Sequence, residues 1–399
     1  MPASAGFDIA KDFHWLAVLD DRGQPVLDHR VDNAPAAIDA AADELLAAAD
    51  RYDGITIGLD VMGGIAGLLT AMLVGHGLRC VHVSGLTVNR ARHGTRGGEN
   101  KSDPRDARVI AEQVMFRTNL RPVPLSRESD AEMRLLVSHR AALVKEITAH
   151  TNRLHDLLAG IHPGLDRAMD STNKSGLILL CRYVTPTEIR RSGSTRIAGH
   201  LRKHGVRPDR SRLLAEAAVA SAQAQHTVIP GEQRAATLAR ELAADLLADR
   251  DRLTALEAEI GQLVDAHPDG ALIRSLPGMG ATLTAVFLAV VGDIHRFGSD
   301  DALAAACGLA PVLAQSGKTR YLRRAKGGDR DLRNVFYQSA FCAIQRDTVS
   351  RGFYDRKRAE GKRHQQALIA LARRRVNVLY AILRDRQPYR ARPQLRLVA

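Results

Sequence analysis

The sequence predicts an α/β domain at the N-terminus, a long helical middle section and a mainly α-helical, basic C-terminal domain. Three observations support this class. Short apolar runs alternate with helical patterns in the first section, two long stretches with apolar residues at helical spacing follow, and basic residues concentrate near the C-terminus. A chain of 399 residues is long enough for two or three domains with their own cores. We expect the domains to span residues 1–125, 126–266 and 267–399.

The first section reads as strands and helices in a recognisable order. Strands are expected at 5–10, 14–20 and 25–31, with the turn residues Asp21-Arg22-Gly23 between the second and third. A helix, a strand, a helix and a strand follow, at 35–50, 55–60, 65–75 and 78–83. This is the order of an RNase H-like (RuvC-like) α/β domain. A further helix is expected to begin at Asp103.

Four aspartates in this section point to a metal site. Asp60 ends one predicted strand, Asp8 lies near the end of another, and Asp103 and Asp106 lie three apart on one helical face. Carboxylates at strand ends and on a later helix can converge, and Mg²⁺ or Mn²⁺ requires such oxygen ligands. As an alternative, Asp8 and Asp60 are ordinary loop aspartates. Asp103 would then be a helix N-cap before Pro104, with Asp106 as the acid of a capping box.

The middle section contains two long amphipathic stretches. Apolar residues recur at helical spacing from Glu128 to about Leu158 and again from about Gln233 to Val264. They predict two arms of a helical hairpin or coiled coil. An oligomerisation stalk and packing within one chain both remain open. The segment between the arms, about 160–232, is basic and less regular, and we assign it only as a helical insertion.

The positive charge of the chain lies almost wholly in its last quarter. From Pro311 to Ala399 there are 22 Lys+Arg against 6 Asp+Glu, an excess of +16 within a total of +13. Such a block is typical of a surface that binds a polyanion, although a merely solvated basic face is the alternative. A second basic stretch precedes Asp103 and is suited to phosphates; it contains Arg90, Arg92, His93, Arg96 and Lys101.

Two short motifs near the C-terminus suggest contacts with nucleic acid. Leu276-Pro277-Gly278-Met279-Gly280 joins two predicted helices and resembles a helix-hairpin-helix turn, in which Gly278 and Gly280 let backbone N–H groups approach a phosphate. Gln315-Ser316-Gly317 places a serine in a positive setting that would stabilise an alkoxide or a phosphoserine. The surrounding cations are Lys318, Arg320, Arg323 and Arg324.

The remaining composition suggests a cellular location. Four scattered cysteines show no zinc-ligand spacing, and Cys80 and Cys307 lie in apolar runs as core thiols would. No apolar run reaches membrane-spanning length, and the N-terminus lacks a signal-peptide pattern. We expect a cytoplasmic, nucleoid-associated protein without membrane contact.

Taken together and in this order, the motifs resemble the DEDD-type transposases of bacterial insertion sequences. The resemblance covers roughly residues 5–150 and 265–385. The matching segments are Phe7-Asp8-Ile9-Ala10-Lys11, Lys101-Ser102-Asp103-Pro104-Arg105-Asp106-Ala107, Leu276-Pro277-Gly278-Met279-Gly280, Phe297 with Gly308-Leu309-Ala310-Pro311, and Gln315-Ser316-Gly317.

The resemblance implies a function and a set of roles. Asp8, Asp60, Asp103 and Asp106 would bind Mg²⁺, and Ser316 would attack the scissile phosphate. It further implies a DNA recombinase that acts on element ends and target, guided by a bridge RNA. The protein would form a homo-oligomer, dimer or tetramer, whose active sites combine domains of two subunits.

One position departs from the family pattern. The second acid is usually glutamate, whereas this chain has Asp60, which is one methylene shorter. Two alternatives stay open, and Asp60 bears only on the second. One is a water-using nuclease of the junction-resolving kind, in which Ser316 is structural, and the other is a nucleic-acid-binding protein without catalysis.

Overall fold

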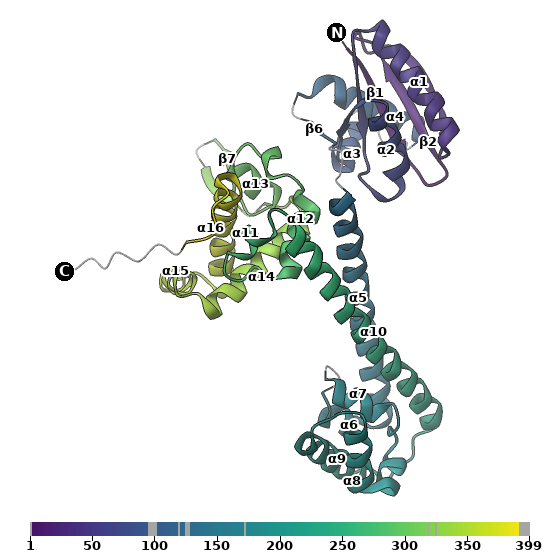
Figure 1. Ribbon diagram of the computed structural model, residues 1–399, viewed down its shortest axis with the longest axis vertical. Coiled ribbons are helices and arrows are strands. Elements are labelled where there is room, and N and C mark those ends of the chain that lie inside the picture. The colour runs from purple at the N-terminus through teal and green to yellow at the C-terminus, as the bar shows by residue number, and fades with distance from the viewer. Residues whose placement is uncertain are drawn as a thin grey trace, which may run out of the picture. The chain divides into compact units, whose positions relative to one another are not determined.

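The fold is described from a computed structural model. It describes residues 2–94, 102–118, 120–123, 128–170, 173–317, 319–323 and 325–390. The chain divides into two compact units, Met1–Arg127 and Glu128–Ala399 (Figure 1).

The first unit is an α/β domain built on one sheet. The strand order is β3-β2-β1-β4-β5-β6; β2 is antiparallel to β1 and to β3, whereas β4 is parallel to β1 and β5 to β4. The predicted order of three strands, helix, strand, helix and strand is confirmed, and with it the RNase H-like arrangement. The elements are β1 (Ala3–Ile9), β2 (Phe13–Leu19), β3 (Pro25–Asp32), α1 (Pro35–Arg51), β4 (Ile55–Leu59), η1 (Gly64–Ala66), α2 (Gly67–Gly75), β5 (Arg79–His82), α3 (Gly85–His93), α4 (Asp103–Phe116) and β6 (Arg121–Pro122).

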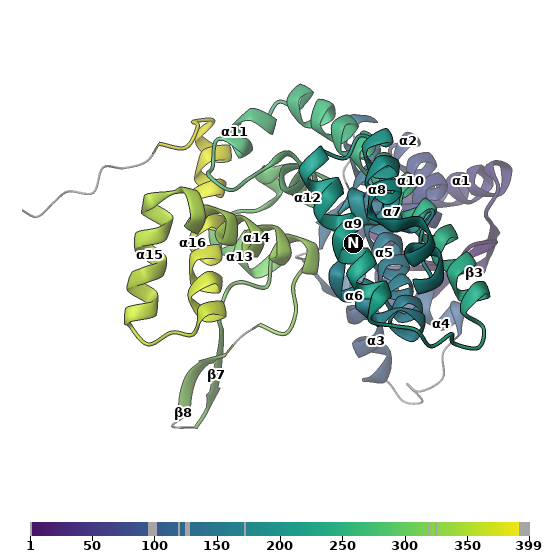
Figure 2. The ribbon, with the colours of Figure 1, turned by 90° about the horizontal axis from the view of Figure 1, so that it is seen from below.

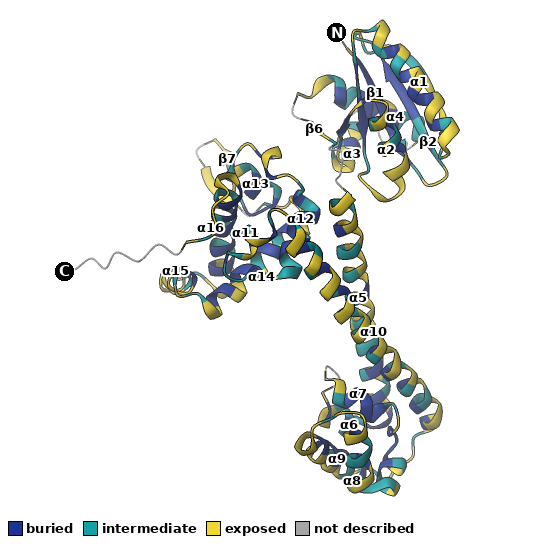
Figure 3. Ribbon diagram, viewed as in Figure 1, coloured by how far each residue is buried: buried dark blue, intermediate teal, exposed yellow. Residues whose placement is uncertain are grey.

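Successive residues of β1 face opposite sides of the sheet. Phe7 and Ile9 join the core that α1 and α2 cover, and the outer surface of α1 is exposed (Figure 3). Gly6 faces α4 on the opposite side of the sheet. Because side chains alternate, Asp8 lies on the same face as Gly6, toward α4.

The second unit begins with two long helices that pack together. They are α5 (Glu128–Ile161) and α10 (Glu232–Ala266), side by side in Figure 1. Leu143 shares a core with Leu256, whereas Leu158 shares another with Ala239, so the two helices run antiparallel. The predicted long helices are confirmed, and they pack within one chain.

Polar contacts also join this helix pair. The Arg140 Nη2 lies 2.6 Å from Glu257 Oε1, and the His150 Nδ1 lies 3.4 Å from the buried Asp249 Oδ2. The Arg140–Glu257 pair is partly exposed, so it favours this alignment of the two helices only modestly.

The segment between the two long helices, expected as a helical insertion, is a helical subdomain. The core of this subdomain combines residues of its own four helices with residues from the last turns of α5 and the first turns of α10. The helices are α6 (Pro163–Ala168), α7 (Lys174–Leu180), α8 (Pro186–Lys203) and α9 (Pro208–Gln223).

The C-terminal part is mainly helical, as predicted, with one additional β-hairpin. Its core includes Leu256, Ile260 and Val264 of α10, so the long helix is continuous with it. Cys307 is buried there, and Cys80 is buried in the first unit, as core thiols should be. The elements are α11 (Gly270–Arg274), α12 (Ala281–Val291), η2 (Ile294–Arg296), α13 (Asp300–Ala306), β7 (Val312–Ser316), β8 (Thr319–Arg323), α14 (Arg330–Arg346), α15 (Thr348–Ala359) and α16 (His364–Asp385).

No helix in the described ranges has both the length and the apolar character needed to cross a membrane.

Candidate active site

Asp8 and Asp60 are neighbours at one edge of the sheet. Phe7 of β1 is paired with Leu59 of the parallel strand β4, so the next residue of each strand is an aspartate. The Ile9 backbone N–H donates to Asp60 Oδ1 at 3.4 Å. The carboxyl ends of parallel strands therefore bring these two carboxylates together, as the sequence predicted.

Helix α4 carries the other two acids to the same edge. A surface cavity of about 330 Å³ is lined by Ala3 and Ser4 from the start of β1 together with Val114 and Met115 from the end of α4. The helix therefore runs antiparallel to β1. Its first turn, with Asp103 and Asp106, lies toward the strand end that carries Asp8.

The close approach of α4 to the sheet depends on Gly6. A Cβ at Gly6 would lie 2.2 Å from the Ala107 carbonyl oxygen and 2.5 Å from the Ala111 nitrogen, both helix backbone atoms. Any side chain at this position would push α4 away from β1.

We expect Gly6→Ala to destabilise the protein by about 1–3 kcal/mol or more, because the clash is with backbone and cannot be relieved by a rotamer change. Thermal unfolding with and without denaturant measures the loss. Gly67→Ala is the matched control, since Gly67 has open space around it and lies in a helix. Equal stabilities of the two variants would contradict this account of α4.

Asp106 is held by an arginine rather than by a capping contact. The residue is 4% exposed, and Arg92 Nη1 donates to both of its carboxylate oxygens at 2.8 Å. Arg92 lies on α3 and also donates to Asn89 Oδ1 at 2.9 Å. The capping-box alternative is therefore wrong. The helix begins at Asp103 with Ser102 as N-cap, no side chain caps it, and the Asp106 carboxylate is engaged elsewhere.

The four acids lie toward the same end of strands β1 and β4 but do not form a tight cluster. Within the described ranges, no three His, Cys, Asp or Glu side chains lie together in a group that could hold a metal ion. The donors are nevertheless all carboxylate oxygens, which is the chemistry that Mg²⁺ and Mn²⁺ select. The positive charge beside Asp106 comes from Arg92, a residue that the sequence suggested only as part of a phosphate-binding loop. Arg96 and Lys101 of that loop lie outside the described residues.

Ser316 lies at the tip of the β7–β8 hairpin. It is the last residue of β7, pairs with Thr319 across the turn, and is exposed. Figure 2 shows the hairpin extending from the body formed by α13, α14 and α16. Its hydroxyl is therefore presented to solvent on a narrow two-stranded ribbon.

The predicted cations around Ser316 are distributed over both faces of the hairpin. Arg323 lies on the face of Ser316 but pairs with Val312, four residues along the strand, which corresponds to about 14 Å. Arg320 pairs with Gln315 and lies on the opposite face. Lys318 and Arg324 lie outside the described residues.

The segments at the base of the hairpin hold it in position. The Asp329 N–H donates to the Ala306 carbonyl at 2.7 Å, and Arg333 Nη2 donates to the Gly327 carbonyl at 2.6 Å. Asp329 also caps α14 by accepting from Leu332 N–H at 2.9 Å. The two segments 308–311 and 326–329 thus fasten both ends of the hairpin to α13 and α14.

The Pro-Gly-Met-Gly turn joins α11 to α12 and packs against α14. Gly278 has a φ of +83°, which favours glycine, and a Cβ there would lie 2.5 Å from the Ser339 carbonyl oxygen. The packing of the turn against α14 is therefore enough to require glycine. Gly280 is exposed, and nothing lies within 4 Å of the Cβ position. The two glycines are therefore in different environments, and only Gly280 presents open backbone.

A buried arginine that the sequence did not reveal supports this turn. Arg375 of α16 is 3% exposed, donates to Ser339 Oγ at 3.0 Å and 2.7 Å, and also donates to the Pro277 carbonyl. Burial lowers the pKa of Arg375 to about 10, which leaves it charged at neutral pH. A run of three arginines in an amphipathic helix gave no signal that the last of them points inward.

Both ends of the chain match family models. Residues 5–163 match a model described as a transposase, and residues 270–355 match the model for the transposase IS116/IS110/IS902 family. The chain is 40% identical to the insertion element IS900 uncharacterized 42 kDa protein of Mycobacterium paratuberculosis, over 97% of each chain. It is 39% identical to the insertion element IS116 uncharacterized 44.8 kDa protein of Streptomyces clavuligerus, over 97% of this chain and 96% of that one. A pilin gene-inverting protein of Moraxella lacunata is 30% identical over 35% of this chain and 45% of its own.

Proposed function

Since the chain belongs to the IS116/IS110/IS902 family of transposases and is therefore a DNA transposase, we propose that it cuts and rejoins DNA with metal-binding carboxylates and a serine nucleophile. The observation that carries the proposal is the pairing of Asp8 with Asp60 at the sheet edge toward which α4 points its own two acids. The gene-inverting activity in the name of the Moraxella relative supports DNA rearrangement as the outcome.

The first unit supplies the acidic half of the proposed site. Asp8, Asp60, Asp103 and Asp106 would hold Mg²⁺ or Mn²⁺, which when bound stabilises negative charge developing on a phosphate. For Asp106 to join, the guanidinium of Arg92 has to give up part of its contact with the carboxylate. Arg92 would then direct part of its guanidinium to a phosphate oxygen of the DNA.

The hairpin supplies the proposed nucleophile. The Ser316 oxygen forms a bond to phosphorus and gives its proton to a base, while the P–O bond to one side of the DNA breaks and the displaced oxygen takes up a proton to become a free hydroxyl. The product is a phosphoserine ester that conserves the bond for rejoining. An exposed hydroxyl on a hairpin tip can reach a bulky substrate, which supports this role.

The other parts have proposed roles in assembly and binding. We assign residues 1–125 to the metal-binding domain, 126–266 to a coiled-coil linker with a helical insertion, and 267–399 to the DNA-binding transposase domain. The α5–α10 pair would support a dimer or tetramer, and the α11–α12 turn would act as a helix-hairpin-helix through Gly280. A bridge RNA would pair with the DNA, so that sequence specificity resides outside the polypeptide.

The function as a whole is tested by reconstitution. The RNA that copurifies with the full-length protein is sequenced, and recombination of plasmids carrying the element ends and target is measured with and without that RNA. Joined products that depend on the RNA support guidance. Products that form equally well without RNA contradict guidance and leave strand transfer itself intact.

The C-terminal basic surface should carry much of the affinity for DNA. We expect Arg320→Gln with Arg323→Gln to weaken DNA binding about tenfold. The slope of log affinity against log salt concentration should fall by the equivalent of about two phosphate contacts, because each contact releases counterions. Fluorescence anisotropy at several salt concentrations measures both. Substitution is preferable to truncation, since removing residues 267–399 would expose Leu256, Ile260 and Val264.

The control for this variant is Arg191→Gln with Arg196→Gln, which makes the same change in net charge at two exposed positions of α8. We expect less than a threefold effect from the control. Equal losses in the two variants would show that only net charge matters and would contradict a specific role for the hairpin arginines.

A further inference from the structure

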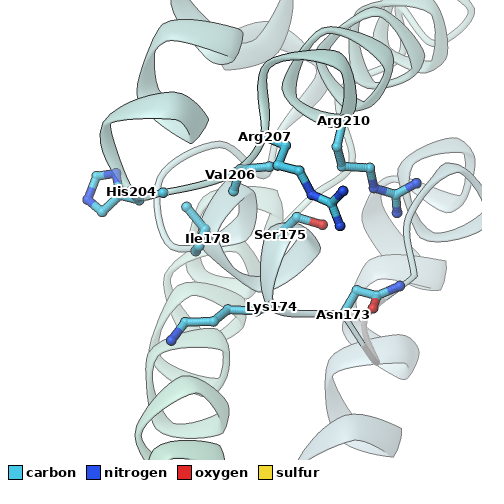
Figure 4. A pocket seen from close by; sticks show the side chains of 9 residues that line it. Asn173, Lys174, Ser175, Ile178, His204, Val206, Arg207 and Arg210 are labelled. Atoms are coloured by element: carbon cyan, nitrogen blue, oxygen red, sulfur yellow. The ribbon is translucent and has the colours of Figure 1, made fainter.

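A basic pocket lies in the helical insertion, between the start of α7 and the corner that joins α8 to α9. Its volume is about 420 Å³, and its polar wall includes Asn173, Lys174, Ser175, His204, Arg207 and Arg210 (Figure 4). These residues fall between the segments 5–163 and 270–355, so neither matching family model covers them.

Two of the cations are available to a ligand. The guanidinium groups of Arg207 and Arg210 make no hydrogen bond or ion pair with any described residue, and Figure 4 shows both on the side of the pocket where the Ser175 hydroxyl lies. Lys174 extends in another direction and pairs with Asp251 at 3.3 Å. The pocket thus has two free guanidinium groups and one hydroxyl directed to a common space.

Negative charge is scarce around this pocket. No aspartate or glutamate is among its described lining residues. Two acids outside the lining pair with lining residues: the Asp170 carboxylate accepts from the Asn173 amide at 2.5 Å, and Asp251 pairs with Lys174. From Asn173 to Arg212 the chain has ten Lys+Arg against two Asp+Glu. The net charge of this segment is therefore positive, which favours an anion in the pocket.

The backbone that carries the two arginines is firmly placed. The α8–α9 corner is closed by a hydrogen bond from Val206 N–H to the Leu201 carbonyl at 3.1 Å. A second bond joins the buried Ser211 hydroxyl to the Val206 carbonyl at 3.1 Å. Ile178 forms an apolar floor beneath them. Little ordering of the backbone would be needed on binding, which favours a true site over a collection of solvated side chains.

We propose that this pocket binds a backbone phosphate of a nucleic-acid strand. Arg207 and Arg210 offer forked donors that match phosphate oxygens, and Ser175 adds a hydroxyl donor. Arg202, Lys203 and Arg212, which flank the α8–α9 corner in the sequence, are also exposed and would pair with further phosphates of the same strand. The inference rests on the proposed function for its ligand class and extends it to the insertion.

The test compares full-length proteins that differ only in this pocket. Arg207→Gln with Arg210→Gln is measured against Arg191→Gln with Arg196→Gln, which lowers the net charge equally on exposed α8 positions outside the pocket. The probes are labelled single-stranded RNA, single-stranded DNA and duplex DNA of one sequence, titrated at several salt concentrations. Thermal unfolding confirms that both variants are folded.

We expect the pocket variant to lose about tenfold in affinity for at least one probe, with a salt slope smaller by one to two contacts, and the control to lose less than threefold. Loss for RNA alone, or for DNA alone, assigns the phosphate to that strand. Equal losses in the two variants overturn the proposal. Stabilisation by inorganic phosphate without any change in nucleic-acid affinity overturns it as well. The readout is binding, so a negative result leaves the strand-transfer proposal standing.

Discussion

Ser316→Ala should abolish recombination, with a loss of at least about a thousandfold, because the substitution removes the oxygen that is proposed to attack the phosphate. The covalent protein–DNA adduct should disappear with it. DNA binding and folding should be unchanged, since the serine is exposed and its hydroxyl fills no core space. Recombination assays and denaturing gels of protein incubated with labelled DNA measure the two losses.

The hairpin provides its own control for this experiment. Thr319 is the cross-strand partner of Ser316, lies on the same face and is also exposed. Thr319→Val removes a neighbouring hydroxyl while keeping the shape of the side chain. We expect this variant to recombine DNA and to form the adduct at nearly the wild-type level.

The alternative to a serine nucleophile makes a different prediction. A nuclease that uses water would still cut DNA after Ser316→Ala, and the wild-type protein would never be found attached to DNA. Recombination by a wild-type protein that forms no adduct would refute the serine mechanism. Cleavage by the Ser316→Ala variant at the wild-type rate would do the same.

Asp8→Asn should eliminate strand cleavage and the stabilisation of the first unit by Mg²⁺. An amide keeps the size of the side chain but gives up the negative charge that draws a divalent cation into the carboxylate edge. In the wild type, Mg²⁺ or Mn²⁺ should raise the unfolding temperature, because the cation binds only the folded arrangement. Asp43→Asn is the control, since it removes the same charge from the exposed surface of α1.

Asp106→Asn is a less clean test of the same site. Its partner Arg92 is 11% exposed at the side chain, so the substitution would leave a largely buried guanidinium without its charge partner and would also lower stability. Asp8→Asn avoids this complication. Full strand cleavage in the presence of a chelator, or an unfolding temperature that Mg²⁺ leaves unchanged in the wild type, would sink the metal proposal.

The positions of the strands and long helices were predictable because their patterns are local. The alternating run from His14 to Leu19 has period two, and the stripe from Gln233 to Val264 has the helical period. The β7–β8 hairpin was missed. Its strands are exposed on nearly every residue, so no alternation of buried and exposed positions marks them.

The neighbourhood of each site residue was predictable only in part. Adjacent strand ends bring Asp8 and Asp60 together, and this follows from the order of elements. The contact between Arg92 and Asp106 joins two helices, and the contact between Arg375 and Ser339 joins two others. Such pairings depend on how helices pack, for which a single sequence carries no periodic signal.

The sequence by itself determined the α/β order of the first unit, the two long helices, the concentration of positive charge in the last quarter and the motifs that mark a transposase. Each of these features depends on residues that are close together in the chain, so periodicity and composition are enough to predict it. Only the tertiary structure decided that Arg92 holds Asp106, that Gly278 serves packing, and that Arg320 and Arg323 lie on opposite faces of the hairpin. Only it placed Arg207 and Arg210 beside Ser175 in one pocket. These facts depend on which side chains the packed backbone brings together, and burial and strand register fix that only once the whole chain has folded.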